Sequence, residues 1–193
     1  MAGIITAPGG LKRAKFERIG LFFCLAVLAA CSEGLVSPGS KDVDDLDTFL
    51  RYGAPGGEAQ LEIHGNPFGV SSEELASGLA EGFKGGVFWG PDLRFSGNSS
   101  SARPGYRFVV AFGAASSVAG DKLCRAAATL ALTPKARPIR VKIAYCVMDR
   151  ALSEVSGQIE DADGPRDSRF GIWAWRLMRA LTPKPDSKWE TTN

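Results

Sequence analysis

The chain has 193 residues, of which 45% are hydrophobic, so it is long enough to bury one sizeable core. It carries 23 lysines and arginines against 21 aspartates and glutamates, a formal net charge of +2. Four of the basic residues and one acidic residue lie within residues 1–30, which leaves residues 31–193 with one net negative charge. Nucleic-acid binding needs a strong positive field, so we expect no nucleic-acid partner.

The first 30 residues have the layout of a secretory signal peptide. An uncharged apolar run, residues 19–30, follows four basic residues, which are Lys12, Arg13, Lys15 and Arg18. As a helix this run would be about 18 Å long, which is too short for a hydrocarbon core of about 30 Å. The pattern therefore predicts a segment that is removed after export and not a membrane-spanning helix.

The run ends in Leu28-Ala29-Ala30-Cys31, which resembles the lipobox of bacterial lipoproteins. The resemblance implies that the Cys31 thiol takes a diacylglycerol and that cleavage makes Cys31 the first mature residue. There are two alternatives: an ordinary signal peptide that is cut near Cys31, and an anchor that is not cleaved. In that family an aspartate after the cysteine favours the inner membrane, so Ser32 indicates the outer membrane. We expect a lipid-anchored protein of the cell envelope that faces the periplasm.

Residues 31–60 have the composition of a flexible tether, with glycines, prolines, serines and an acidic patch. A short helix within it is predicted by the helical spacing of Val43, Leu46, Phe49 and Leu50. As a coil the tether would reach roughly 30 Å and hold the domain clear of the lipid headgroups.

Residues 61–182 are predicted to form the domain. The sequence indicates strands at residues 61–64, 87–89, 93–95, 106–112 and 139–145, and leaves residues 123–132 open between helix and strand. Residues 139–145 alternate apolar and basic side chains, which is typical of a half-exposed strand. Residues 154–167 are polar and rich in turn formers, and residues 183–193 are expected to be a disordered tail.

Two helices are predicted with defined ends. Ser71 and Glu74 form a capping-box pattern before a helix at residues 72–83, in which Gly78 and Gly82 would permit close packing on a sheet. A second helix starts at Asp167 or Ser168 and stops at Thr182. Irregular alternation of helices and strands favours an α+β fold with a mainly antiparallel sheet and helices packed on one face.

Two short stretches of the mature chain are similar to uncharacterised proteobacterial lipoproteins. They are His-Gly-Asn-Pro-Phe at residues 64–68 and Ala-Leu-Ser-Glu-Val-Ser-Gly at residues 151–157. This resemblance implies no particular activity.

The cysteines predict one disulfide. Cys24 leaves with the signal peptide and Cys31 is committed to lipid, so Cys124 and Cys146 remain to pair in an oxidising compartment. Closing a loop of about 22 residues would stabilise the fold by about 3 kcal/mol, and two buried free thiols are the alternative. The chain has no Cys-x-x-Cys motif and one histidine, so we expect no metal site and no cofactor.

Three groups of residues are weak candidates for a functional site. His64 ends a predicted strand and could act as a general base or a ligand, although a local turn is the commoner reason for such a residue. Asp161 and Asp163 lack the third ligand and the glutamate of a calcium loop, so a solvated turn is expected. The last helix carries Trp173, Trp175 and three arginines, either as a core-docking face or as a membrane-contacting one.

The expected function is therefore non-enzymatic: a lipid-anchored domain that binds a protein or another envelope partner. A hydrolase using His64 is the first alternative. The second is a module that binds a small ligand or lipid in an apolar groove near Trp89.

Overall fold

The computed structural model describes residues 34–41, 46–87 and 90–183. Six strands form one sheet in the order β1-β6-β5-β4-β2-β3. The pairs β1–β6, β6–β5 and β5–β4 are antiparallel, and β2 pairs in parallel with both β4 and β3. The fold is α+β with a mainly antiparallel sheet, as the sequence predicted.

The elements follow one another along the chain with these bounds. The strands are β1 (Leu35–Lys41), β2 (Glu58–His64), β3 (Arg94–Ser96), β4 (Tyr106–Phe112), β5 (Ile139–Val147) and β6 (Arg150–Ile159). The helices are α2 (Leu46–Gly53), α3 (Ser72–Phe83), α4 (Gly120–Ala126) and α5 (Ser168–Leu181), with a 3-10 turn, η2, at Ala127–Thr129. None of the helices in the described ranges is long and apolar enough to cross a membrane.

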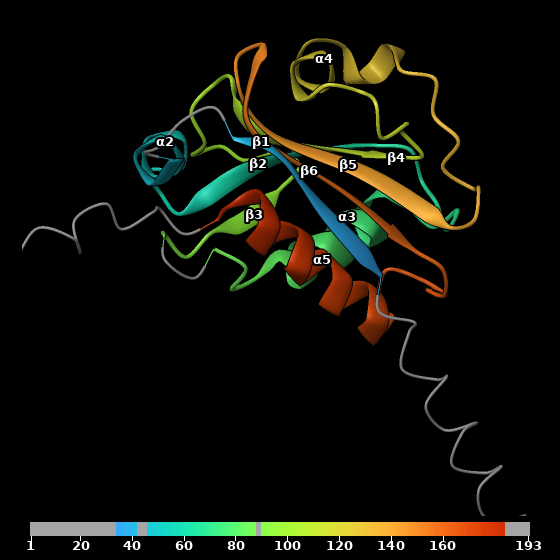
Figure 1. Ribbon diagram of the computed structural model, residues 1–193. Coiled ribbons are helices and arrows are strands. Elements are labelled where there is room, and N and C mark those ends of the chain that lie inside the picture. Colours follow the sequence, from blue (N-terminus) through green and yellow to red (C-terminus); the bar gives the residue numbers. More distant parts are fainter. Residues whose placement is uncertain (1–33, 42–45, 88–89, 184–193) are drawn as a thin grey trace, which may run out of the picture. The chain divides into compact units, whose positions relative to one another are not determined.

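The main core lies between the sheet and the layer formed by α3 and α5 (Figure 1). β4 contributes Phe108, Val110 and Phe112 to this core because alternate residues of a strand face the same side. Phe170 of α5 is almost completely buried and stacks on Phe112, and the equally buried Trp173 packs beside Phe170. The two leucines of α2, Leu46 and Leu50, belong to the same core.

A smaller core lies on the other face of the sheet, under α4 (Figure 1). It contains Val109 and Ala111 of β4 together with Leu123 of α4. The Cys124–Cys146 disulfide belongs to this core and joins α4 to β5, with the two Cα atoms 5.6 Å apart. The predicted disulfide is therefore present, and helices cover both faces of the sheet rather than one.

The prediction of a flexible tether is wrong for the described residues between Gly34 and Gln60. β1 pairs with β6 along the edge of the sheet, α2 buries Leu46 and Leu50, and β2 starts at Glu58, three residues before the predicted domain boundary. The helical spacing of α2 was visible in the sequence. β1 was not, because its side chains are mostly exposed and Pro38 is tolerated only because the strand lies at an edge.

The polar segment that begins at Glu154 is also corrected. Its first half belongs to β6, which pairs along one edge of β5. The second half of the segment, up to Asp167, is the loop before α5. β5 is buried on both faces because the two cores lie against it, Ile143 in the main core and Ala144 in the smaller one. Lys142 is only 4% exposed, and its buried charge is compensated by an ion pair between its Nζ atom and Glu154 Oε1 at 3.0 Å. The half-exposed strand predicted here is thus a central one.

The two predicted helices have the predicted ends. Ser71 Oγ accepts a hydrogen bond from the Glu74 backbone amide at the start of α3, and Asp167 accepts one from the Arg169 amide at the start of α5. Gly78 and Gly82 permit close packing, but against α5 and the loop before it rather than against the sheet. A Cβ atom at Gly78 would lie 2.5 Å from Pro165, and one at Gly82 would lie 2.7 Å from the Ala174 Cβ atom.

Candidate functional site

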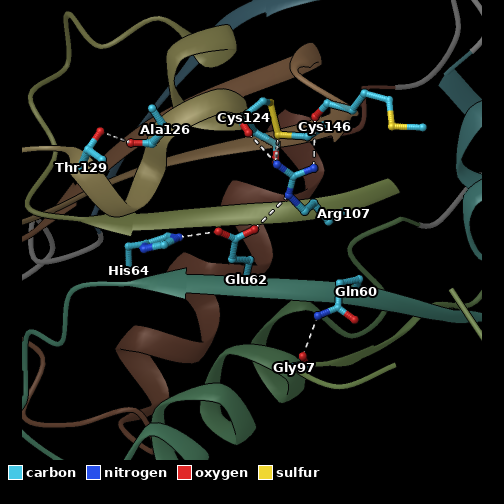
Figure 2. A network of polar contacts seen from close by, with 11 residues as sticks. Gln60, Glu62, His64, Gly97, Arg107, Cys124, Ala126, Thr129 and Cys146 are labelled. Carbon is cyan, nitrogen blue, oxygen red and sulfur yellow. Dashed lines mark hydrogen bonds and ion pairs between the residues drawn. A yellow bond between two sulfur atoms is a disulfide. The ribbon is translucent and has the colours of Figure 1, made fainter. Parts of the chain in front are cut away.

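The parallel pairing of β2 with β4 brings three charged or titratable side chains to the sheet face under α4. Glu62 and His64 are two residues apart on β2 and therefore share a face. Gln60 is paired with Arg107 of β4, which places Arg107 on that face as well. Figure 2 shows the three side chains converging between β2, β4 and the disulfide.

The three side chains form one connected network. His64 Nε2 lies 2.6 Å from Glu62 Oε1, and Arg107 Nε donates to Glu62 Oε2 at 2.9 Å (Figure 2). Arg107 Nη1 also donates to the Met148 carbonyl at 3.0 Å, and its Nη2 donates to the Cys124 carbonyl. Arg107 thus joins β4 to β2, to the end of β5 and to α4.

Nucleophilic catalysis assisted by His64 would need a group that orients the imidazole ring and a nucleophile within hydrogen-bonding distance of it, and the network provides the first of these. Glu62 could orient the imidazole ring, as a carboxylate does in a catalytic triad. In the described part of the chain, however, no serine, threonine or cysteine forms a hydrogen bond with that ring. The Thr129 hydroxyl donates to the Ala126 carbonyl at 2.9 Å, and the sulfur atoms of Cys124 and Cys146 are joined in the disulfide (Figure 2). Through Arg107, the arrangement ties α4 to the sheet.

The loop after His64 is a self-contained turn. Asn66 Oδ1 accepts hydrogen bonds from the backbone amides of Phe68 and Gly69, and its Nδ2 atom donates to the Val70 carbonyl at 2.6 Å. Gly65 has a φ of +78°, and a Cβ atom there would lie 2.6 Å from the Phe112 carbonyl oxygen. These residues fix how the chain passes from β2 to α3.

A groove with a volume of about 800 Å³ lies between α3 and α5, away from His64. Small residues, Gly78, Gly82 and Gly171, line it, and Ile172 and Trp175 contribute apolar side chains that are 50% and 38% exposed. Glu81, Lys84 and Arg166 add charges of both signs. The sequence contains no motif for this groove, since it arises from the packing of two helices.

The aromatic residues of α5 divide between two roles. Trp173 is 1% exposed and its Nε1 atom donates to the Leu35 carbonyl, so it ties α5 to β1. Trp175 lies on the outer side, where the Arg179 guanidinium is 4.8 Å from the ring centroid. The core-docking prediction thus applies to Trp173, and Trp175 belongs to the groove.

The acidic loop before α5 is held by Arg169. Its guanidinium contacts Asp163 at 3.3 Å and Asp167 at 2.6 Å. The hydrogen bond from Arg169 holds the pKa of the Asp167 carboxyl well below its usual value, and hydrogen bonds from two backbone amides act in the same direction. Among the described residues, no three His, Cys, Asp or Glu side chains gather as a metal site would require, and Asp161 and Asp163 form no such group.

Cys31, Ser32 and Trp89, which the sequence analysis singled out, lie outside the described residues, as do the predicted signal peptide and residues 184–193 of the predicted tail. Comparisons with known protein families, with curated proteins and with solved structures find no match to this chain.

Proposed function

We propose that this chain is a lipid-anchored protein of the bacterial cell envelope, attached through Cys31, whose domain binds a protein partner and catalyses no reaction. The basic n-region, the apolar run and the Leu-Ala-Ala-Cys motif support the anchor. The Cys124–Cys146 disulfide supports export, because such bonds persist in oxidising compartments and are rare in the cytosol.

The α3–α5 groove carries the binding part of the proposal. Its apolar centre, formed by Ile172 and Trp175, is flanked by charges of both signs at Glu81, Lys84 and Arg166. An apolar centre with a polar rim is the anatomy of a protein interface, and tryptophan and arginine are enriched there. We infer that the occupant is the apolar face of a helix from another envelope protein, because rim charges of mixed sign suit a peptide better than an anionic lipid.

The His64 network speaks against the hydrolase alternative. Both carboxylate oxygens of Glu62 and three nitrogen atoms of Arg107 are engaged within the protein. A side chain whose hydrogen bonds all serve to hold neighbouring elements is better explained by stability than by chemistry.

Site-specific photocrosslinking in intact envelopes tests the groove. A photoreactive residue replaces Ile172 in the lipidated full-length protein, and a control carries it at Met148, which is 60% exposed in the β5–β6 turn. We expect a protein adduct of one reproducible mass at position 172 and none at position 148. Trp175→Glu should abolish that adduct, whereas Tyr52→Glu, at another exposed aromatic residue, should leave it.

Other results would reject the protein partner. Equal adducts at both positions would mean unspecific contact, and an adduct with the mass of a lipid would favour the small-ligand alternative. The anchor has a separate test: intact-mass analysis of the native protein should show a chain that starts at Cys31 and carries acyl groups. A free amino terminus elsewhere, without fatty acid, would reject the anchor.

A further inference from the structure

The position of β1 sets how far the domain can stand from a lipid on Cys31. Only Ser32, Glu33 and Gly34 separate Cys31 from Leu35, the first residue of β1. A chain extends by at most about 3.6 Å per residue, so Leu35 lies within about 14 Å of Cys31 in any conformation. Most of residues 31–60, which were predicted to be a tether that holds the domain away from the headgroups, instead form β1, α2 and the start of β2.

The sheet has a hollow at the end where β1 starts. Its volume is about 440 Å³, and it is lined by Leu35, Ser37, Ser116, Arg140, Ser156 and Gln158 together with neighbouring small residues. Leu35, Gln158 and Arg140 form one row across β1, β6 and β5, because Gln158 is paired with both of the others. Ser37 and Ser156 are paired in the same way two residues further along. We call this feature the β1 hollow.

The β1 hollow combines a cationic side chain, hydroxyl groups and an exposed apolar side chain. Arg140 is exposed, and in the part of the chain that the structure describes no carboxylate forms an ion pair with it. Lys135 and Arg137 precede it in the loop that leads into β5 and are also exposed. Two carboxylates, Glu160 and Asp161, follow β6 at the same end of the strands, and neither lines the hollow. Leu35 is 63% exposed at the rim.

We propose that the β1 hollow binds the phosphate-bearing headgroup of an anionic phospholipid in the membrane that anchors the chain. Phosphate oxygens accept hydrogen bonds from arginine guanidinium groups and from hydroxyl groups. Each basic residue near an anionic membrane surface raises the binding constant for that surface about fivefold. This attraction falls off within a Debye length of about 10 Å. The short link to Cys31 holds the hollow near that range. This inference rests on the proposed anchor.

Hydrogen–deuterium exchange on the natively lipidated protein tests the inference. The protein is reconstituted in vesicles of phosphatidylcholine alone or of phosphatidylcholine with phosphatidylglycerol. We expect phosphatidylglycerol to slow exchange severalfold in residues 113–118 and 133–138, which flank the β1 hollow. Residues 102–105 and 148–150, at the other end of the strands, should exchange equally in both kinds of vesicle.

Matched charge reversals identify the binding surface. Arg140→Glu should remove the effect of phosphatidylglycerol, and Lys135→Glu should weaken it. Lys122→Glu, the same change in charge on an exposed lysine of α4, should leave it intact. Equal exchange in the two kinds of vesicle, or an equal effect of Lys122→Glu and Arg140→Glu, would overturn the inference.

Two further outcomes separate this inference from its alternatives. If inorganic phosphate added to phosphatidylcholine vesicles slows exchange to the same extent, the hollow takes a soluble anion and the membrane source is rejected. If mass analysis finds acyl groups on Cys31 but phosphatidylglycerol has no effect, the inference fails while the proposed anchor stands. A chain without acyl groups would overturn both.

Discussion

Arg107 joins parts of the chain that lie far apart in the sequence. It is bonded to Glu62 on β2 and to the backbone carbonyls of Cys124 and Met148. Its side chain is 22% exposed, so the loss of these bonds would be compensated only partly by water. We predict that Arg107→Ala lowers the free energy of unfolding by about 2 kcal/mol, the range for hydrogen bonds to a charged group.

His64→Ala is the comparison for that variant. His64 makes one side-chain contact in the network, with Glu62, whose side chain is 38% exposed. We expect this variant to lose less than about 1 kcal/mol. Urea unfolding of the two variants measures the difference. A larger loss for His64→Ala would mean that the histidine, and not the arginine, holds the network together.

Asp167 gives a prediction with a defined dependence on pH. Asp167→Ala removes the N-cap of α5, which costs about 1 kcal/mol at pH 7. Because Arg169 lowers the pKa of the native carboxyl, the carboxylate stabilises the fold fully above the usual value of 3.8, and this contribution is lost as the pH falls through the lower native pKa. The stability gap between wild type and Asp167→Ala should therefore narrow below about pH 4.

Unfolding of both proteins between pH 7 and pH 2 checks this prediction. Asp163→Ala is the control, because the Asp163 side chain is 96% exposed and should contribute little. A gap that widens towards low pH would show that the Asp167 carboxyl is not stabilised in its charged form.

At the scale of elements, two glycines that line the same groove should respond in opposite ways to alanine. At Gly78 a Cβ atom would lie 2.5 Å from the backbone oxygen of Pro165, whereas at Gly171 it would meet nothing within 4 Å. Alanine gains about 1 kcal/mol over glycine in a helix interior, but overpacking costs about 1–3 kcal/mol.

We therefore predict that Gly78→Ala lowers the melting temperature and that Gly171→Ala raises it. Thermal unfolding followed by circular dichroism measures both shifts. Stabilisation by both substitutions would mean that α3 does not pack closely on the loop before α5.

The elements differ in how far the sequence predicts them, and the reasons are physical. α3 and α5 have caps and a clear apolar period, and β4 is a continuous apolar run, so local signals were sufficient. β6 has polar residues at Glu154, Ser156 and Gln158 because it faces the hollow and the buried Lys142. An irregularity in its pairing with β5, between Tyr145 and Cys146, also breaks its apolar alternation. β1 is specified by backbone pairing with β6, which leaves almost no pattern in side chains.

The candidate sites divide in the same way. The proximity of Glu62 and His64 follows from their spacing on a strand, and the disulfide followed from counting cysteines. The contribution of Arg107 depends on the parallel pairing of β2 with β4, and the α3–α5 groove and the β1 hollow depend on which elements are neighbours. No local sequence signal contains that information.

At the scale of the whole molecule, the place where the fold starts relative to Cys31 determines what the domain can reach. A domain on a coil of about 28 residues would sample distances of roughly 30 Å from the membrane. If Cys31 carries the proposed anchor, a domain that starts at Leu35 would be held close to the surface, and the β1 hollow lies at the end of the sheet where that short link begins. A longer link between Cys31 and Leu35 should therefore weaken the contact with anionic lipid without affecting the fold.

We predict this outcome for insertion of about ten glycine and serine residues after Ser32, a linker with a reach of roughly 18 Å. That distance exceeds the Debye length of about 10 Å, so the attraction between Arg140 and the headgroups weakens. Hydrogen exchange should show a smaller effect of phosphatidylglycerol on residues 113–118 and 133–138. The melting temperature should not change, because the insertion precedes β1. If the lipid effect persists at full size, the hollow binds headgroups by its own affinity and the short link does not contribute.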